Sequence, residues 1–251
     1  PTNVGQYYVI ASAAAVTNKT AAASSSCTSH KITAKAVTVT AGSTSRAWNN
    51  SALTNSTCTA GSGQLVSGHT VTCTMTSGST ITTAGSVDNV ISTVTIKNSG
   101  GTDVTSNYSV TTAKGTLTIT LATPTVSLTA KTATWTGSAI AANAATASPD
   151  AGGTKSYTYY TDSSCSTQTT TASGASAAGG APSLAGQYYV KATVAAVTNK
   201  TNVAYSACTS HKINVATPTV SLTAKEATYT GSGIAANTAT VSPNSSPTIT
   251  Y

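Results

Sequence analysis

The chain repeats itself, and this repetition constrains its fold more than any other feature. The segment GQYYVIASAAAVTNKT begins at Gly5, and the closely similar GQYYVKATVAAVTNKT begins at Gly186. A second segment, ATPTVSLTAK, begins at Ala122 and again at Ala216. Self-similarity at long spacing indicates an array in which one small structural unit occurs several times.

A third, divergent unit lies between these copies. The sequence WNNSAL from Trp48 resembles WTGSAI from Trp135 and YTGSGI from Tyr229, so each unit has an aromatic residue, a short turn and an aliphatic residue in register. Four regions follow from this alignment: the C-terminal half of a first-type repeat (1–34), a divergent repeat (35–121), a complete first-type repeat (122–215) and the N-terminal half of a first-type repeat (216–251).

The hydrophobic pattern alternates with a period of two residues. VSLTA from Val126 and VTCTM from Val71 each place apolar side chains on one face and polar ones on the other. Gly, Ser, Asn and Pro interrupt such segments at short intervals, as turns do. Short alternating strands with frequent turns predict an all-β fold, namely tandem immunoglobulin-like β-sandwich domains.

The composition argues against several classes of function. The net charge is +7, but the lysines are scattered singly and form no stripe along a phosphate backbone, so nucleic acid is not an expected partner. No segment is apolar for 18 residues, so no membrane span is expected. The few acids are spread out, and neither a G-x-S-x-G nor a C-x-x-C motif occurs. We therefore expect no enzymatic activity, metal or cofactor.

Two tyrosines follow a glycine at matching positions. Gly186 and Tyr188, like Gly5 and Tyr7, have the spacing of the tyrosine corner at the entry to a late strand of immunoglobulin-like domains. Tyr108 is a candidate for the same position in the divergent repeat. The alternative is that YYV is simply a tyrosine-rich strand.

The repeats resemble a known kind of domain. The first-type unit, with TYYTDSSC, GGAPSLAGQYYVKATVAA and YSACTSHKI, and the divergent unit, with SGHTVTCTMTSG and AGSVDNVISTVTI, are similar to the tandem bacterial immunoglobulin-like (MBG/Big-like) repeats of Gram-positive surface proteins. The resemblance covers essentially the whole chain. It implies an extracellular, cell-surface location and no catalytic residues, and it specifies no ligand.

The cysteines fit the repeat boundaries. Cys165 and Cys208 share the complete repeat, Cys58 and Cys73 share the divergent repeat, and Cys27 aligns with Cys208 but has no partner in residues 1–34. We therefore predict disulfides Cys165–Cys208 and Cys58–Cys73, with Cys27 unpaired. Reduced thiols are the alternative, which the extracellular setting disfavours.

Two further hypotheses concern single side chains. Bacterial surface domains of this kind can carry a Lys–Asn isopeptide bond, and Lys131 with Asn214, assisted by Asp162, are the candidates. A solvated Lys131 is the alternative. His30 and His211 occupy the same repeat position and are expected on strand surfaces rather than at a metal.

These features favour a structural function. We expect a stalk or fibre of tandem domains; the alternative is an adhesin module for glycan or host protein, which would need exposed aromatic residues such as Trp48 and Trp135. The expected partners are further repeats or neighbouring copies. Either the chain is a window from a longer array, or the half-repeats of successive copies join head to tail. The window is favoured, because the counterpart of residues 158–181 is missing from both halves.

Overall fold

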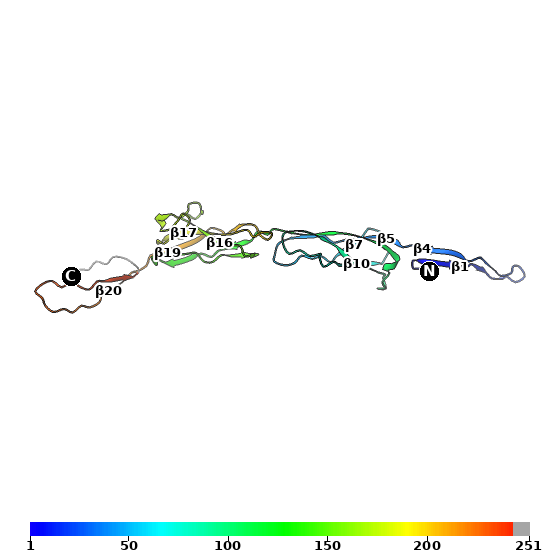
Figure 1. Cartoon of the computed structure of the whole chain (residues 1–251), viewed down its shortest axis with the longest axis horizontal. Coiled ribbons are helices and arrows are strands. Elements are labelled where there is room, and N and C mark those ends of the chain that lie inside the picture. The colour runs from blue at the N-terminus through cyan, green and yellow to red at the C-terminus, as the bar shows by residue number, and fades with distance from the viewer. Residues whose placement is uncertain (243–251) are drawn as a thin grey trace. The chain divides into compact units, whose positions relative to one another are not determined.

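A computed structural model of the chain describes residues 1–242, and their regular secondary structure is almost entirely β-strand (Figure 1). The regular elements of these residues are strands, apart from two short 3₁₀ helices. Thr, Val and Tyr are common in the strands, and such side chains suit a pleated, half-buried surface. The all-β prediction is confirmed. The chain divides into two compact units at the junction between Leu121 and Ala122.

The first unit contains the N-terminal half-repeat and the divergent repeat. In the half-repeat, β1 (Gly5–Val9) pairs antiparallel with β4 (Thr28–Ile32), and β2 (Ser12–Ala13) with β3 (Ala23–Ser24). The divergent repeat contains β5 (Lys35–Ala41), β6 (Thr44–Ala47), β7 (Cys58–Ala60), β8 (Thr70–Met75), β9 (Gly85–Asn89), β10 (Ile91–Lys97), η1 (Thr105–Asn107), β11 (Tyr108–Ala113) and β12 (Gly115–Thr120).

The divergent repeat has a hydrophobic core that draws on several small sheets. Its sheets have the strand orders β11-β5-β7, β6-β12-β9 and β10-β8. Alternation along β5 buries Val37 and Val39, which cluster with Ile91 and Ile96 of β10 and with Tyr108 of β11. The period-two pattern in the sequence thus corresponds to the buried faces of these strands.

Two long segments of the divergent repeat switch from one sheet to another. The β5–β6 segment turns at Gly42, and the β11–β12 segment passes beside it at Gly115. A Cβ atom at Gly115 would overlap the backbone carbonyls of Ala41 and Gly42, so only glycine allows this close approach. The buried Asn89 amide secures the switch point by donating to the carbonyls of Gly42 (2.8 Å) and Asn55 (2.9 Å).

The complete repeat forms most of the second unit. Its elements are β13 (Thr125–Ser127), β14 (Lys131–Thr134), β15 (Thr146–Ser148), β16 (Lys155–Tyr160), η2 (Thr171–Ser173), β17 (Gly186–Val194), β18 (Ala204–Tyr205) and β19 (Thr209–Asn214). A sheet of order β14-β19-β17-β16 forms its main layer, with β18 beside β17, and β13 pairs with β15. Val190, Ala192 and Val194 alternate along β17 and are buried.

The two repeats share one pairing plan despite their different sequences. The first strand pairs antiparallel with the third in each, as β5 with β7 and β13 with β15. The second strand pairs parallel with the last one, as β6 with β12 and β14 with β19. The Trp48 N–H donates to the Thr120 carbonyl, and the Trp135 N–H donates to the Asn214 carbonyl, both at 2.9 Å. The aligned tryptophans therefore end equivalent strands.

The C-terminal half-repeat reproduces the opening of the complete repeat. Its β20 (Thr219–Ser221) pairs antiparallel with β21 (Thr240–Ser242), as β13 does with β15. Residues 243–251 lie outside the described residues.

Candidate functional site

The two half-repeats expose side chains that the complete repeat buries. Val9 is 54% exposed, whereas its counterpart Val190 is 1% exposed. Ile234 is 43% exposed, whereas its counterpart Ile140 is 9% exposed. Tyr229, at the position of Trp135, is 88% exposed. The exposed faces belong to parts of the same domain design, so the complete repeat shows what the equivalent side chains pack against.

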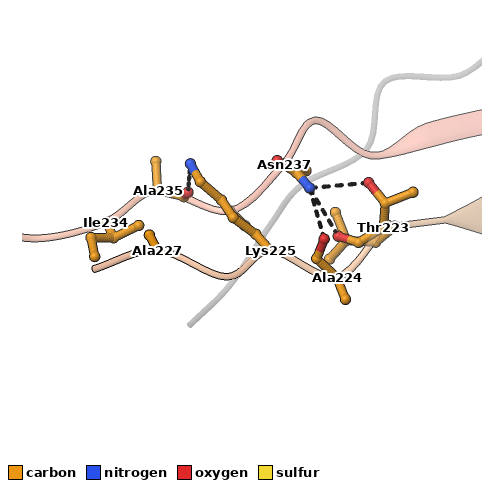
Figure 2. Close-up of a pocket in the computed structure, with 9 residues that line it drawn as sticks. Thr223, Ala224, Lys225, Ala227, Ile234, Ala235 and Asn237 are labelled. Atoms are coloured by element: carbon orange, nitrogen blue, oxygen red, sulfur yellow. Dashed lines mark hydrogen bonds between the residues drawn. The ribbon is translucent and has the colours of Figure 1, made fainter. Parts of the chain in front are cut away.

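The C-terminal half-repeat contains an open groove at this face. Figure 2 shows it between the segment after β20 and the segment before β21. It has a volume of about 440 Å³. The lining side chains are mainly small or aliphatic, with one lysine and one asparagine at the rim: Leu222, Thr223, Ala224, Lys225, Ala227, Ile234, Ala235, Ala236 and Asn237.

Hydrogen bonds fix the walls of this groove. The Lys225 ammonium donates to the Ala235 carbonyl at 2.7 Å, and the Asn237 amide donates to the Ala224 carbonyl and the Thr223 hydroxyl, both at 3.1 Å (Figure 2). The complete repeat has the same contacts, since Lys131 donates to Ala141 and Asn143 to Ala130 and Thr129. The groove therefore has the local geometry of a complete domain.

In the complete repeat the equivalent space is filled from the closing strands. Ile140 forms a buried cluster with Tyr188 of β17 and Ile213 of β19, against which Ala133 and Trp135 pack. Two tyrosines of β16 hydrogen-bond to the backbone that follows Ile140. The Tyr159 hydroxyl accepts a hydrogen bond from the Ala142 N–H (2.6 Å), and the Tyr157 hydroxyl accepts one from the Ala145 N–H (2.8 Å).

The N-terminal half-repeat carries the matching closing strands. The register of β1 with β4 pairs Gly5 with Ile32, and the register of β17 with β19 pairs Gly186 with Ile213, its exact repeat equivalent. The turn between β2 and β3 is also preserved, because Asn18 (φ 61°) and Asn199 (φ 56°) occupy the same left-handed position. The Val4 N–H donates to the Asn107 side-chain oxygen (2.8 Å), which attaches this half-repeat to the divergent repeat.

Both predicted disulfides are present. Cys58 is bonded to Cys73, linking β7 to β8, and Cys165 is bonded to Cys208, linking the loop after β16 to the start of β19. Cys27 is free and exposed. The Asp162 carboxylate organises the loop that presents Cys165. It accepts hydrogen bonds from the Ser164 hydroxyl and from the backbone N–H groups of Thr167 and Ser166, and these bonds lower the pKa of Asp162.

The tyrosine positions differ between the repeats. Tyr7 donates its hydroxyl hydrogen to the Asn3 carbonyl (2.8 Å), four residues upstream, as a tyrosine corner requires. The Tyr188 ring folds back over Gly186, where a Cβ would come within 3.0 Å of its hydroxyl. Tyr108 does not form the short-range bond. It lies in β11, and its hydroxyl contacts the Val66 N–H (3.0 Å) and the His69 ring (2.7 Å), so the Tyr108 prediction is wrong.

The structure does not bring the isopeptide candidates together. Lys131 pairs in register with His211, and its ammonium donates to the Ala141 carbonyl at 2.6 Å. Asn214 pairs with Thr134, three positions or about 10 Å further along the strands. Asp162 is held in its own turn. The isopeptide hypothesis has no geometric basis in this arrangement.

His211 is fully buried, so its predicted surface position is wrong. It lies two residues before Ile213 on the inward face of β19, with its ring edge-on to Tyr159 at 5.3 Å. Among the described residues neither ring nitrogen has a hydrogen-bond partner. Desolvation dominates and, aided by the charge of Lys131 and only partly opposed by the nearby Ile140 backbone, lowers the pKa of His211. His30, its counterpart, is exposed.

Acid is expected to destabilise the complete repeat through His211. Because the folded state holds the His211 pKa below its ordinary 6.5, the unfolded chain binds more protons just below pH 6.5. The free energy of unfolding should be highest above pH 6.5 and fall on acidification, by up to about 1.4 kcal/mol per pH unit. Urea unfolding between pH 7.5 and 5 measures this. His30→Gln should keep the slope and His211→Phe should flatten it; an unchanged slope in His211→Phe would assign it to another group.

Other candidate chemistry has little basis in the described part of the chain. No group of three His, Cys, Asp or Glu side chains there could hold a metal ion, and no helix there is long and apolar enough to cross a membrane. Trp48 is 3% exposed, and Trp135 packs on the Ile140 cluster. Comparison with known protein families, curated proteins and solved structures finds no match to this chain.

Proposed function

We propose that the chain is a structural component of an extracellular bacterial stalk or fibre, built from tandem immunoglobulin-like β-sandwich domains. The observation that carries the proposal is the pairing plan shared by the divergent and the complete repeat, each of which also has its own disulfide. Domains of the same fold that follow one another along a chain form a spacer, because each domain adds length without adding a new binding or catalytic site.

The strand order supports a mechanical role. In each repeat an early strand pairs parallel with the last strand, as β6 with β12 and β14 with β19. When the ends of such a domain are pulled apart, these strands are loaded in shear, so several hydrogen bonds must break together. The disulfides then limit how far each domain can extend. This is the arrangement expected of a tether that bears force.

The composition and the disulfides fit an extracellular setting. Disulfides persist mainly in oxidising compartments outside the cytosol. Only 7% of residues are charged, and the described side chains form two ion pairs, Lys114–Asp88 and Lys155–Asp150, both partly or largely exposed. Exposed pairs of this kind contribute little to stability, so the cross-links and the packed cores are the main stabilising features.

The alternative function, an adhesin for glycan or host protein, has weaker support. Its expected feature was an exposed aromatic cluster at Trp48 and Trp135, and both side chains pack against their own domains. Within residues 1–242 the most exposed tyrosines, Tyr8, Tyr205 and Tyr229, belong to three different repeats.

The proposed function is tested by pulling single molecules from their termini. A tether should unfold in separate cooperative steps, one for each folded repeat, and each step should lengthen when its disulfide is reduced. A chain that extends gradually, without distinct steps, would contradict a mechanical function.

A further inference from the structure

We propose that Asn3 determines which kind of repeat follows the N-terminal half-repeat, by binding Asn107 of the divergent repeat. Leu184 occupies the same repeat position where another first-type repeat follows. The inference rests on the proposed stalk function and specifies how two consecutive domains of the stalk recognise each other. The partner that fits the surface around Asn107 is a first-type repeat with asparagine at this position.

Both polar groups of the Asn107 side chain bind the preceding repeat. The side-chain oxygen accepts a hydrogen bond from the Val4 N–H (2.8 Å), and the side-chain amide donates to the Asn3 side-chain oxygen (3.1 Å). These partners lie 103 and 104 positions away in the sequence, within the same compact unit. A side chain that donates and accepts at once recognises a polar neighbour and is left unsatisfied by an apolar one.

The divergent repeat holds Asn107 in place. The Asn107 N–H donates to the Val104 carbonyl (2.9 Å) within η1, and the Thr105 hydroxyl of η1 accepts from the Ile96 N–H of β10 (2.8 Å). The next residue, Tyr108, is buried, and its hydroxyl is hydrogen-bonded to the loop before β8. The core therefore anchors Asn107 on both sides, so little ordering is needed to receive a neighbour.

The preceding repeat holds Asn3 in place as well. The Tyr7 hydroxyl donates to the Asn3 carbonyl (2.8 Å). The partner strand of β1 is β4, which ends at Ile32, and β5 begins at Lys35 after only two linking residues. The two repeats are thus connected at two places, the covalent link and the Asn107 contact. Pivoting about the link would break the bonds to Asn107, so the contact stiffens this joint.

The sequence difference between the two first-type copies coincides with the contact. PTNVGQYY at residues 1–8 aligns with PSLAGQYY at residues 182–189. Threonine and serine share a hydroxyl, and Val4 contributes only its backbone N–H, which Ala185 also has. The change from Asn3 to Leu184 is therefore the one that alters the chemistry offered to Asn107, because leucine has no polar side-chain group.

The test is amide hydrogen exchange of the full chain, measured residue by residue by NMR. The Val4 N–H should be protected in the native chain, because Asn107 accepts its hydrogen bond. Asn107→Leu replaces the amide by an apolar group of similar size and should speed Val4 exchange at least about 10-fold. Asn107→Asp keeps an acceptor oxygen for Val4, and the Asn3 amide can turn to donate to it. This variant should exchange within about 3-fold of the native chain.

Substitutions at the selecting position test the specificity. Asn3→Leu introduces the residue of the complete repeat and should speed Val4 exchange about 10-fold, as Asn107→Leu does. The double variant should exchange no more than about 2-fold faster than either single variant, because both remove the same contact. Leu184→Asn is the matched control in the complete repeat and should leave Val4 exchange unchanged.

The buried Val39 of β5 reports whether the divergent repeat stays folded in each variant. Asn3→Leu lies outside that repeat, so it tests the contact even where Asn107→Leu disturbs the fold. Val4 exchange that is already fast in the native chain, or that Asn3→Leu leaves within about 2-fold of the native rate, would overturn the proposal. The stalk would survive that result if the repeats still unfold in separate steps under force.

Discussion

Replacing Cys165 and Cys208 together by serine is expected to lower the free energy of unfolding of the complete repeat by about 4 kcal/mol. The disulfide joins two cysteines that are 43 positions apart in the sequence. Without it, the unfolded chain gains the conformational freedom of the loop that the bond had closed. A small domain has only about 5–15 kcal/mol of stability in total. The loss should therefore lower the urea midpoint of this repeat substantially and leave that of the divergent repeat in place.

Cys27→Ser is the matched control, because Cys27 occupies the repeat position of Cys208 but is free and exposed. It should change stability by less than about 0.5 kcal/mol. Replacing Cys58 and Cys73 should lower the stability of the divergent repeat by about 3 kcal/mol, in line with its 15-residue separation. A loss below about 1 kcal/mol in the Cys165 and Cys208 variant would show that the bond is not a main stabilising feature.

Ile213→Ala is expected to destabilise the complete repeat by about 2–5 kcal/mol. Ile213 is 2% exposed and packs with Ile140 and Tyr188, so shortening it removes buried methyl groups and leaves a cavity between the opening and closing strands. Urea unfolding of the full chain measures the shift.

The control for this substitution is Ile32→Ala. Ile32 is the repeat equivalent of Ile213 but is only partly buried. Its replacement should cost less than about 1 kcal/mol. Equal losses in the two variants would show that the closing strands of the half-repeat are already packed in the isolated chain, which would contradict the exposed face described above.

The sequence was sufficient to predict the features that depend on repetition and alternation. The strands follow the period-two pattern, as in β5 and β17, and the cysteine pairs followed from asking which cysteines share a repeat. The exposed half-repeats also follow from the alignment, since Val9 and Ile234 have buried counterparts in the complete repeat.

The wrong predictions concern side chains whose surroundings depend on more than the repeat alignment. His211 is predicted at a strand surface together with His30, which occupies the same repeat position, although it alternates with Ile213 and so shares its inward face. Tyr108 precedes a valine by two residues like the other tyrosines, but it lies in a strand paired parallel with β5, so its hydroxyl contacts residues far upstream. Pairing partners of this kind depend on topology, which a local motif does not specify.

The most direct test of the mechanical account compares single-molecule extension with and without reductant. Reduction should lengthen the unfolding step of the complete repeat by roughly 150 Å, because 43 residues at about 3.5 Å each are released. The step of the divergent repeat should lengthen by roughly 50 Å, from 15 residues. Two separate steps with these increments are the result that the account predicts. Extension that is unchanged by reductant, or that shows no separate steps, would contradict it.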